Sequence, residues 1–117
     1  MAGISIKTKR IYEKPEKEDG FRILVDRLWP RGLKKDDAAV DLWFRDIAPS
    51  NELRKWFAHD TSKWNEFREK YKEELEDKPA LLKTFNRLVH NQKNITLLFS
   101  AKDEIHNNAV VLKDFIQ

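Results

Sequence analysis

The chain has 117 residues, with 23 Lys and Arg against 20 Asp and Glu, and it contains no cysteine. This length predicts one domain with one core, and the lack of cysteine excludes disulfides, a thiolate nucleophile and Cys-based zinc sites. Three glycines are too few for a Gly-rich phosphate loop or a dinucleotide fingerprint, which argues against P-loop NTPases and Rossmann dehydrogenases.

Positive charge is concentrated in the first third of the chain. Residues 1–35 hold ten Lys and Arg against five Asp and Glu, whereas residues 36–117 carry a net charge of −2. This surplus suggests an anionic partner but is too small to establish nucleic-acid binding. No stretch approaches the ~18 apolar residues of a membrane span, and the N-terminus lacks a signal-peptide pattern, so we expect a cytoplasmic protein without membrane contact.

The first third is predicted to form two strands. Residues 4–12 alternate between two faces, which predicts the opening strand. Residues 13–20 are predicted to form a charged surface loop. The apolar run Ile23-Leu24-Val25 predicts a strand buried on both faces, as in parallel sheets. We expect it to end near Trp29, before the turn Pro30-Arg31-Gly32.

The next stretch gives conflicting signals. Residues 34–48 fit both helical and strand spacing, and we predict a short helix followed by a strand near 41–47. Pro49 must end this segment. Ser50 is a good N-cap for a short helix that stops before Asp60.

The remaining chain predicts two more helices, a strand and a final helix. Residues 60–62 cap a helix whose buried stripe is Trp64, Phe67, Tyr71 and Leu75. Pro79 suits the first turn of the next helix. Residues 91–94 are predicted to form a polar turn after it. Residues 95–99 predict a buried strand, followed by a helix from about Ile105. The order predicts an α/β fold: a single domain with a small, mostly parallel sheet flanked by helices.

Charged residues follow both buried strands. Arg27 and Arg31 come after the first, and Lys102 after the last. Parallel neighbours would place these strand ends at one edge, where open α/β sheets hold ligands. Two guanidinium groups there would bind a carboxylate or phosphate. The alternative, which stays open, is that an Arg–carboxylate pair only pins the turn.

Two histidines are candidates for chemistry, and His90 is assigned a helix-capping role. His106 would exchange a proton with a bound group, oriented by Asp103 or Asp60, at a helix N-terminus that favours anions. The alternative is that Asp103 merely caps this helix and leaves His106 idle.

The candidate ligand-binding residues are Arg27, Arg31, Arg54, His59, Lys102 and Asn107, and the candidate catalytic residues are His106 and Asp103. Arg54 and His59 share the short helix and the turn after it. His59, Asp60, Asp103 and His106 show no metal-binding spacing, so we predict neither a metal nor a cofactor.

Several segments together resemble the YeaO-like family, grouped under domain of unknown function 488. They are Val25–Gly32 (VDRLWPRG), Ala48–Phe57, Phe67–Tyr71, Leu97–Asp103 and His106–Leu112. The resemblance runs nearly end to end. It implies a small single-domain α/β cytosolic protein and carries over no catalytic assignments. Distant members of the wider group have Cys-His-Arg at the start of the final helix, where this chain reads Ile105-His106-Asn107-Asn108.

Three functions are therefore weighed. The first is binding of a small, phosphate-bearing anion at the sheet edge, with hydrolysis as the reaction to test. The second is nucleic-acid binding by the basic N-terminal third, which predicts a contiguous Lys and Arg surface. The third is a protein-interaction module, which predicts an exposed patch of Trp or Phe. The sequence decides neither whether the protein is an enzyme nor its oligomeric state.

Overall fold

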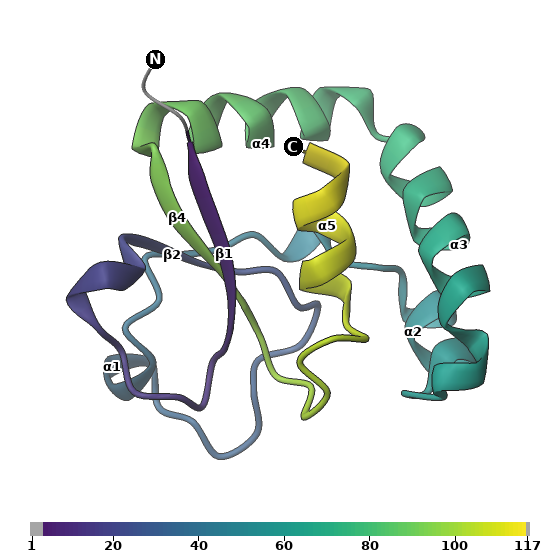
Figure 1. The fold of residues 1–117 in the computed structure, drawn as a ribbon, viewed down its shortest axis with the longest axis horizontal. Helices are drawn as coiled ribbons and strands as arrows, with labels where there is room; N and C mark the ends of the chain where they lie inside the picture. The colour runs from purple at the N-terminus through teal and green to yellow at the C-terminus, as the bar shows by residue number, and fades with distance from the viewer. Residues whose placement is uncertain (1–3, 117) are drawn as a thin grey trace.

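The computed structural model describes residues 4–116, in which four parallel strands form one sheet in the order β1-β4-β2-β3 (Figure 1). The strands are β1 (Ser5–Arg10), β2 (Phe21–Leu24), β3 (Leu42–Trp43) and β4 (Asn94–Phe99). The helices are α1 (Lys35–Ala38), α2 (Asn51–Phe57), α3 (Trp64–Glu76), α4 (Pro79–Gln92) and α5 (Asn108–Ile116). The predicted α/β class and parallel sheet are confirmed. No helix within residues 4–116 has the length and apolar character that crossing a membrane requires.

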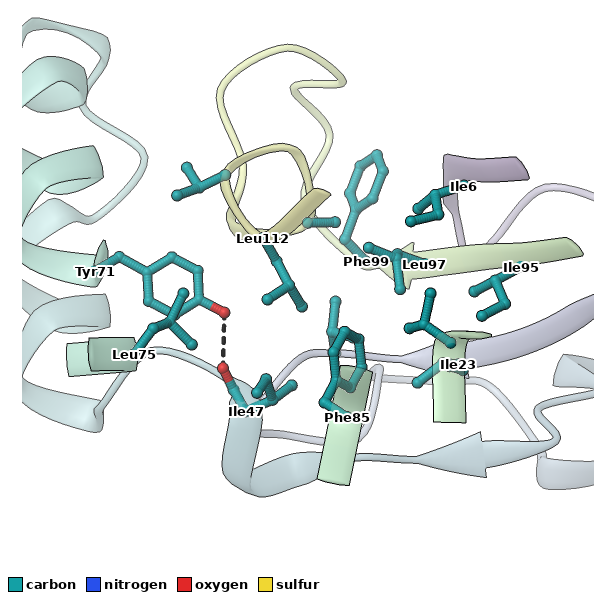
Figure 2. Packing of buried hydrophobic residues seen from close by; sticks show 14 of the residues in the cluster. Ile6, Ile23, Ile47, Tyr71, Leu75, Phe85, Ile95, Leu97, Phe99 and Leu112 are labelled. Atoms are coloured by element: carbon teal, nitrogen blue, oxygen red, sulfur yellow. Dashed lines mark hydrogen bonds between the residues drawn. The ribbon is translucent and has the colours of Figure 1, made fainter. Parts of the chain in front are cut away.

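One face of the sheet carries the main core. Ile23 and Leu97 are register partners on this face and are fully buried. Side chains from α2, α3, α4 and α5 pack over them, and Figure 2 shows the sheet residues meeting Tyr71, Phe85 and Leu112. The Tyr71 hydroxyl donates to the Ile47 carbonyl at 2.7 Å, which ties α3 to the segment before α2.

The opposite face has a thinner cover. Leu24 and Leu98 form a small second core with Ala38 of α1 and the half-buried Trp29 and Trp43. The two indole rings meet edge to face, with centroids 5.5 Å apart. Because β2 and β3 are parallel, the connection between them crosses this face from the carboxyl edge, where β2 ends, to the amino edge, where β3 begins.

Three predicted boundaries were wrong. The strand expected near 41–47 is only β3, because the chain turns into a 3₁₀ helix at Arg45–Ile47. Strand β2 ends at Leu24 rather than near Trp29, since the residues beyond Val25 bond to other segments. Helix α4 runs through most of the expected polar turn at 91–94 and ends with Lys93 in the left-handed conformation.

The predicted surface loop 13–20 holds one buried acid. Asp19 is only 5% exposed, and its carboxylate bonds to Lys9 at 3.1 Å and to Arg22 at 2.5 Å. The guanidinium of Arg22 also donates to the carbonyls of Ala38 and Ala39. This cluster anchors the amino end of β2 to α1, a role that the loop's charged composition did not indicate.

Candidate functional site

A cleft of about 1100 Å³ lies at the carboxyl edge of the sheet. All eight predicted site residues line it: Arg27, Arg31, Arg54, His59, Lys102, Asp103, His106 and Asn107. They meet because β2 and β4 are parallel neighbours, so the segments that follow the two strands leave the sheet side by side. Their convergence is a structural fact, whereas ligand contact by each residue stays a prediction. A shallower depression beside β3, lined by residues 42–46, contains none of them.

Asp26 is a cleft residue that we did not include among the candidates. Its carboxylate accepts from the Ser100 backbone N–H at 2.9 Å and hydroxyl at 2.7 Å, and from the Asn108 amide at 3.1 Å. It thereby joins the ends of β2 and β4 to the start of α5. Burial raises the pKa of the Asp26 carboxyl, and these uncharged donors only partly offset the effect. The available signal was its position as the first polar residue after the buried run.

The two predicted arginines have different roles. Arg27 donates from Nε to the Pro49 carbonyl at 2.9 Å and from Nη2 to the Ala48 carbonyl at 3.1 Å. It pins the segment before α2 through backbone carbonyls, whereas we had considered a carboxylate. Arg31 is exposed, and within residues 4–116 its guanidinium forms neither a hydrogen bond nor an ion pair. Arg31 is therefore the better placed of the two to bind a ligand.

His106 is held by Asp103, one of the two partners we predicted. Its Nδ1 lies 2.8 Å from the Asp103 carboxylate, and its ring meets the Trp64 ring edge to face at 5.1 Å between centroids. The backbone N–H groups of His106 and Ile105 also donate to Asp103. These backbone bonds and the imidazole lower the pKa of Asp103 to about 2. Asp60 instead accepts from Ser62, at the start of a 3₁₀ turn.

The final helix begins later than expected, at Asn108 rather than about Ile105. Asp103 therefore closes a turn in the preceding loop, and the prediction that it caps α5 was wrong. Asn107 supplies that cap, since its Oδ1 accepts from the Val110 N–H at 3.0 Å. Asn107 is only 2% exposed and also donates to the Asp103 carbonyl. The anion site expected at a helix start beside Lys102 is thus displaced, because five residues separate Lys102 from α5.

The turn after α2 forms another wall of the cleft. Ser50 caps this helix as predicted, accepting from the Leu53 N–H at 3.1 Å. The helix ends with Ala58 and His59 both in the left-handed conformation, at φ values of 46° and 58°. Arg54 lies one turn earlier and donates to Asn51 at 3.3 Å. This geometry places Arg54 and His59 at the cleft, on the side opposite the strand ends.

The cleft has more cationic than anionic side chains. Its Lys and Arg residues are Arg10, Arg27, Arg31, Arg54, Lys55 and Lys102, and its carboxylates are Asp26 and Asp103. Both carboxylates already accept hydrogen bonds from the protein, whereas the side chains of Arg31 and Lys102 make none with residues 4–116. Arg10 was missed by our sequence reasoning, although a residue that ends a strand of a parallel sheet belongs to this edge. Such a surface favours an anionic ligand.

No three or more His, Cys, Asp or Glu side chains among residues 4–116 are grouped to hold a metal ion. His59, Asp103 and His106 line the cleft, but Asp60 does not.

Comparisons with known proteins identify the family. A family described as the inactive DUF488-N3 subclade matches residues 5–117. The chain belongs to the YeaO-like DUF488 family. This DUF488 protein is 45% identical over 114 residues to the "Uncharacterized protein YeaO" of Escherichia coli (strain K12), covering 97% of this chain and 98% of the relative.

Two mycobacterial relatives agree with this assignment. They are "Uncharacterized protein Mb3100c" of Mycobacterium bovis and "Uncharacterized protein Rv3073c" of Mycobacterium tuberculosis, each 37% identical over 111 residues. The alignments cover 95% of the DUF488 chain and 92% of each relative. No solved structure matches.

Proposed function

We propose that this DUF488 protein binds a small, phosphate-bearing anion in the cleft and does not convert it. The observation that carries the proposal is the charge of the lining. Six Lys and Arg side chains line the cleft, and its two carboxylates already accept hydrogen bonds from the protein. Arg31, Lys102 and Lys55 are cationic side chains of the cleft that bond to nothing else within residues 4–116, whereas Arg27 is held by backbone carbonyls. The cleft volume is close to the upper end for small-molecule sites.

Two observations favour binding over hydrolysis. The matched family carries the word inactive in its description. The chain has no cysteine, and the hydroxyl of Ser100 in the cleft donates to Asp26 rather than to a histidine. The His106–Asp103 pair can hold and orient a proton. Its role in this proposal is to present a positioned imidazole to the bound anion.

The nucleic-acid alternative has lost support. It relied on the basic first third, but Lys9 and Arg22 are paired with Asp19, and Lys7 donates to the Glu18 carbonyl. These cations are used within the protein and add little to an open basic surface. The protein-interaction alternative required exposed Trp or Phe, and all of these side chains, which lie within residues 4–116, are buried or half-buried.

The proposal is tested by Arg31→Gln, with calorimetric titration of inorganic phosphate and a panel of phosphorylated metabolites. Loss of one charge-assisted bond to the anion should weaken binding about tenfold or more. The melting temperature should remain that of the wild type, because Arg31 is exposed. Arg87→Gln on α4, an exposed arginine outside the cleft, is the matched control and should bind as the wild type does.

Two results would contradict the proposal. If Arg31→Gln and Lys102→Gln together leave phosphate binding unchanged, the anion does not bind at these residues. Release of inorganic phosphate from any bound ester, lost in His106→Ala, would show that the protein is catalytic.

A further inference from the structure

Exposed apolar side chains gather at the rim of the same cleft. Among residues 4–116, the large hydrophobic side chains that are exposed are Tyr12 at 40%, Leu28 at 55% and Ile105 at 69%. Tyr12 and Leu28 line the cleft, whereas Ile105 is not one of its lining residues. Single exposed hydrophobic residues are common, but their concentration at one cleft indicates a binding surface.

We infer that the ligand is a phosphate monoester whose organic group is apolar, rather than a bare phosphate or a sugar phosphate. This inference rests on the proposed function and names the ligand class for the same cleft. The organic group would cover Leu28 and Tyr12 while the phosphate engages Arg31 and Lys102.

Apolar and cationic groups are adjacent at this rim. The Arg10 guanidinium lies over the Tyr12 ring, 4.7 Å from its centroid. The Tyr12 hydroxyl in turn donates to the Arg31 backbone carbonyl at 2.8 Å, which places the ring beside Arg31. Leu28 lies three residues before Arg31, in the same segment. An anion held by Arg31 would therefore share the cleft with the apolar surface of Tyr12 and Leu28.

The lining beyond the rim supports an organic group of small-molecule size. Trp29, Pro49, Phe57, Ala58 and Phe67 also contribute to the cleft. The amide and hydroxyl side chains of the lining, Ser100, Asn107 and Asn108, already form hydrogen bonds within the protein. A bare phosphate would fill only a small part of the volume of about 1100 Å³. A polyhydroxylated sugar phosphate would leave its hydroxyls facing apolar side chains, which costs binding free energy.

The test compares inorganic phosphate, phenyl phosphate and glucose 6-phosphate by calorimetric titration of the full chain. Phenyl phosphate should bind about tenfold more tightly than the other two, since partial burial of the ring adds hydrophobic free energy. Leu28→Gln should remove much of this advantage while affecting inorganic phosphate far less, and Ile105→Gln, an exposed apolar residue outside the lining, is the matched control and should keep the advantage. Both residues are exposed, so the melting temperature should stay near that of the wild type. Arg31→Gln should weaken all three probes.

The outcomes separate the two proposals. Equal binding of the three probes would overturn the apolar-ester inference and leave anion binding intact. A phenyl phosphate advantage that survives Leu28→Gln, or that is lost equally in Ile105→Gln, would also overturn it, because the gain would then arise elsewhere. Failure of every probe to bind would overturn anion binding, and the inference with it.

Discussion

Strand β2 has an Asp and an Arg close to each of its ends, and the two pairs are used in opposite ways. At the amino end, Asp19 bonds directly to Arg22 and Lys9. At the carboxyl end, Asp26 accepts from Ser100 and Asn108, and Arg27 donates to backbone carbonyls. At the amino end the charges pair with one another, whereas at the carboxyl end charged side chains line the cleft.

The pKa values express the same difference. Burial acts to raise the pKa of Asp19, but bonds from the Glu16 backbone N–H, Lys9 and Arg22 outweigh it, and the pKa is lowered. Burial also raises the pKa of Asp26, and there the uncharged donors and His59 do not outweigh it. The lesson is that a carboxylate removed from water is stabilised only where cations reach it. The end without such compensation is where we place the ligand.

The largest expected effect is that of Asp19→Asn. It would leave Arg22, which is 4% exposed, without its charge partner, and removing one partner of a buried pair costs about 3–5 kcal/mol. Urea unfolding at pH 7 measures this loss, and Asp36→Asn, at an exposed position of α1, is the control. A loss below ~1 kcal/mol would mean that the amino end of β2 is not held by its charges.

The two glycines near β2 test the same contrast in backbone packing. Gly20 has φ +66°, and a Cβ there would lie 2.4 Å from the Asn94 carbonyl oxygen, whereas Gly32 has φ +77° with nothing within 4 Å. Gly20→Ala should cost about 3 kcal/mol, from strain and a clash with backbone. Gly32→Ala should cost about 1 kcal/mol from its φ alone. Chemical unfolding of both variants measures how much free energy of unfolding each one loses. Equal losses would contradict the difference in packing between the surroundings of Gly20 and those of Gly32.

The smallest effect at pH 7 is expected for Asp26→Asn. The amide keeps an acceptor for Ser100 and removes a buried charge, but its NH₂ opposes the Asn108 amide, so the net change should be below about 1 kcal/mol. The pH dependence of the stability difference between the wild type and Asp26→Asn is the sharper test. Because the folded pKa of Asp26 is raised, ionisation destabilises the folded protein above that value, and this cost disappears as pH falls below the usual 3.8.

Acid titration of stability should therefore give opposite signs for the two carboxylates. Between pH 7 and pH 3.5, the wild type should gain stability relative to Asp26→Asn. Relative to Asp19→Asn it should lose stability below about pH 3.8, because a lowered folded pKa contributes stability that disappears as pH falls through it. Unfolding curves of the three proteins from pH 7 to well below pH 3.8 measure both slopes. Slopes of the same sign would refute the assignment of one end as paired and the other as unpaired.

Much of the fold could be predicted from the sequence because its signals are local. The apolar run around Ile23, the Ser50 cap and the first turn at Pro79 all gave the correct element, since each depends on neighbouring residues alone. The prediction of the site also relied on a general rule, that parallel neighbours such as β2 and β4 align their carboxyl ends. This rule accounts for six of the eight predicted residues at the cleft, and Arg54 and His59 come instead from α2 and the turn after it.

Only the tertiary structure decided what each charged side chain does there. Arg27 and Arg31 are equivalent in sequence, but the carbonyls before α2 come within reach of Arg27 alone. Asp103 was the cap that the sequence suggested for α5, but the loop after β4 extends to Asn107, which caps the helix instead. Asp19 and Asp26 differ because two cations from other positions of the sheet reach only one of them. Hydrogen bonds and ion pairs act over about 3 Å, so the role of a charge is set by neighbours that the linear sequence does not place.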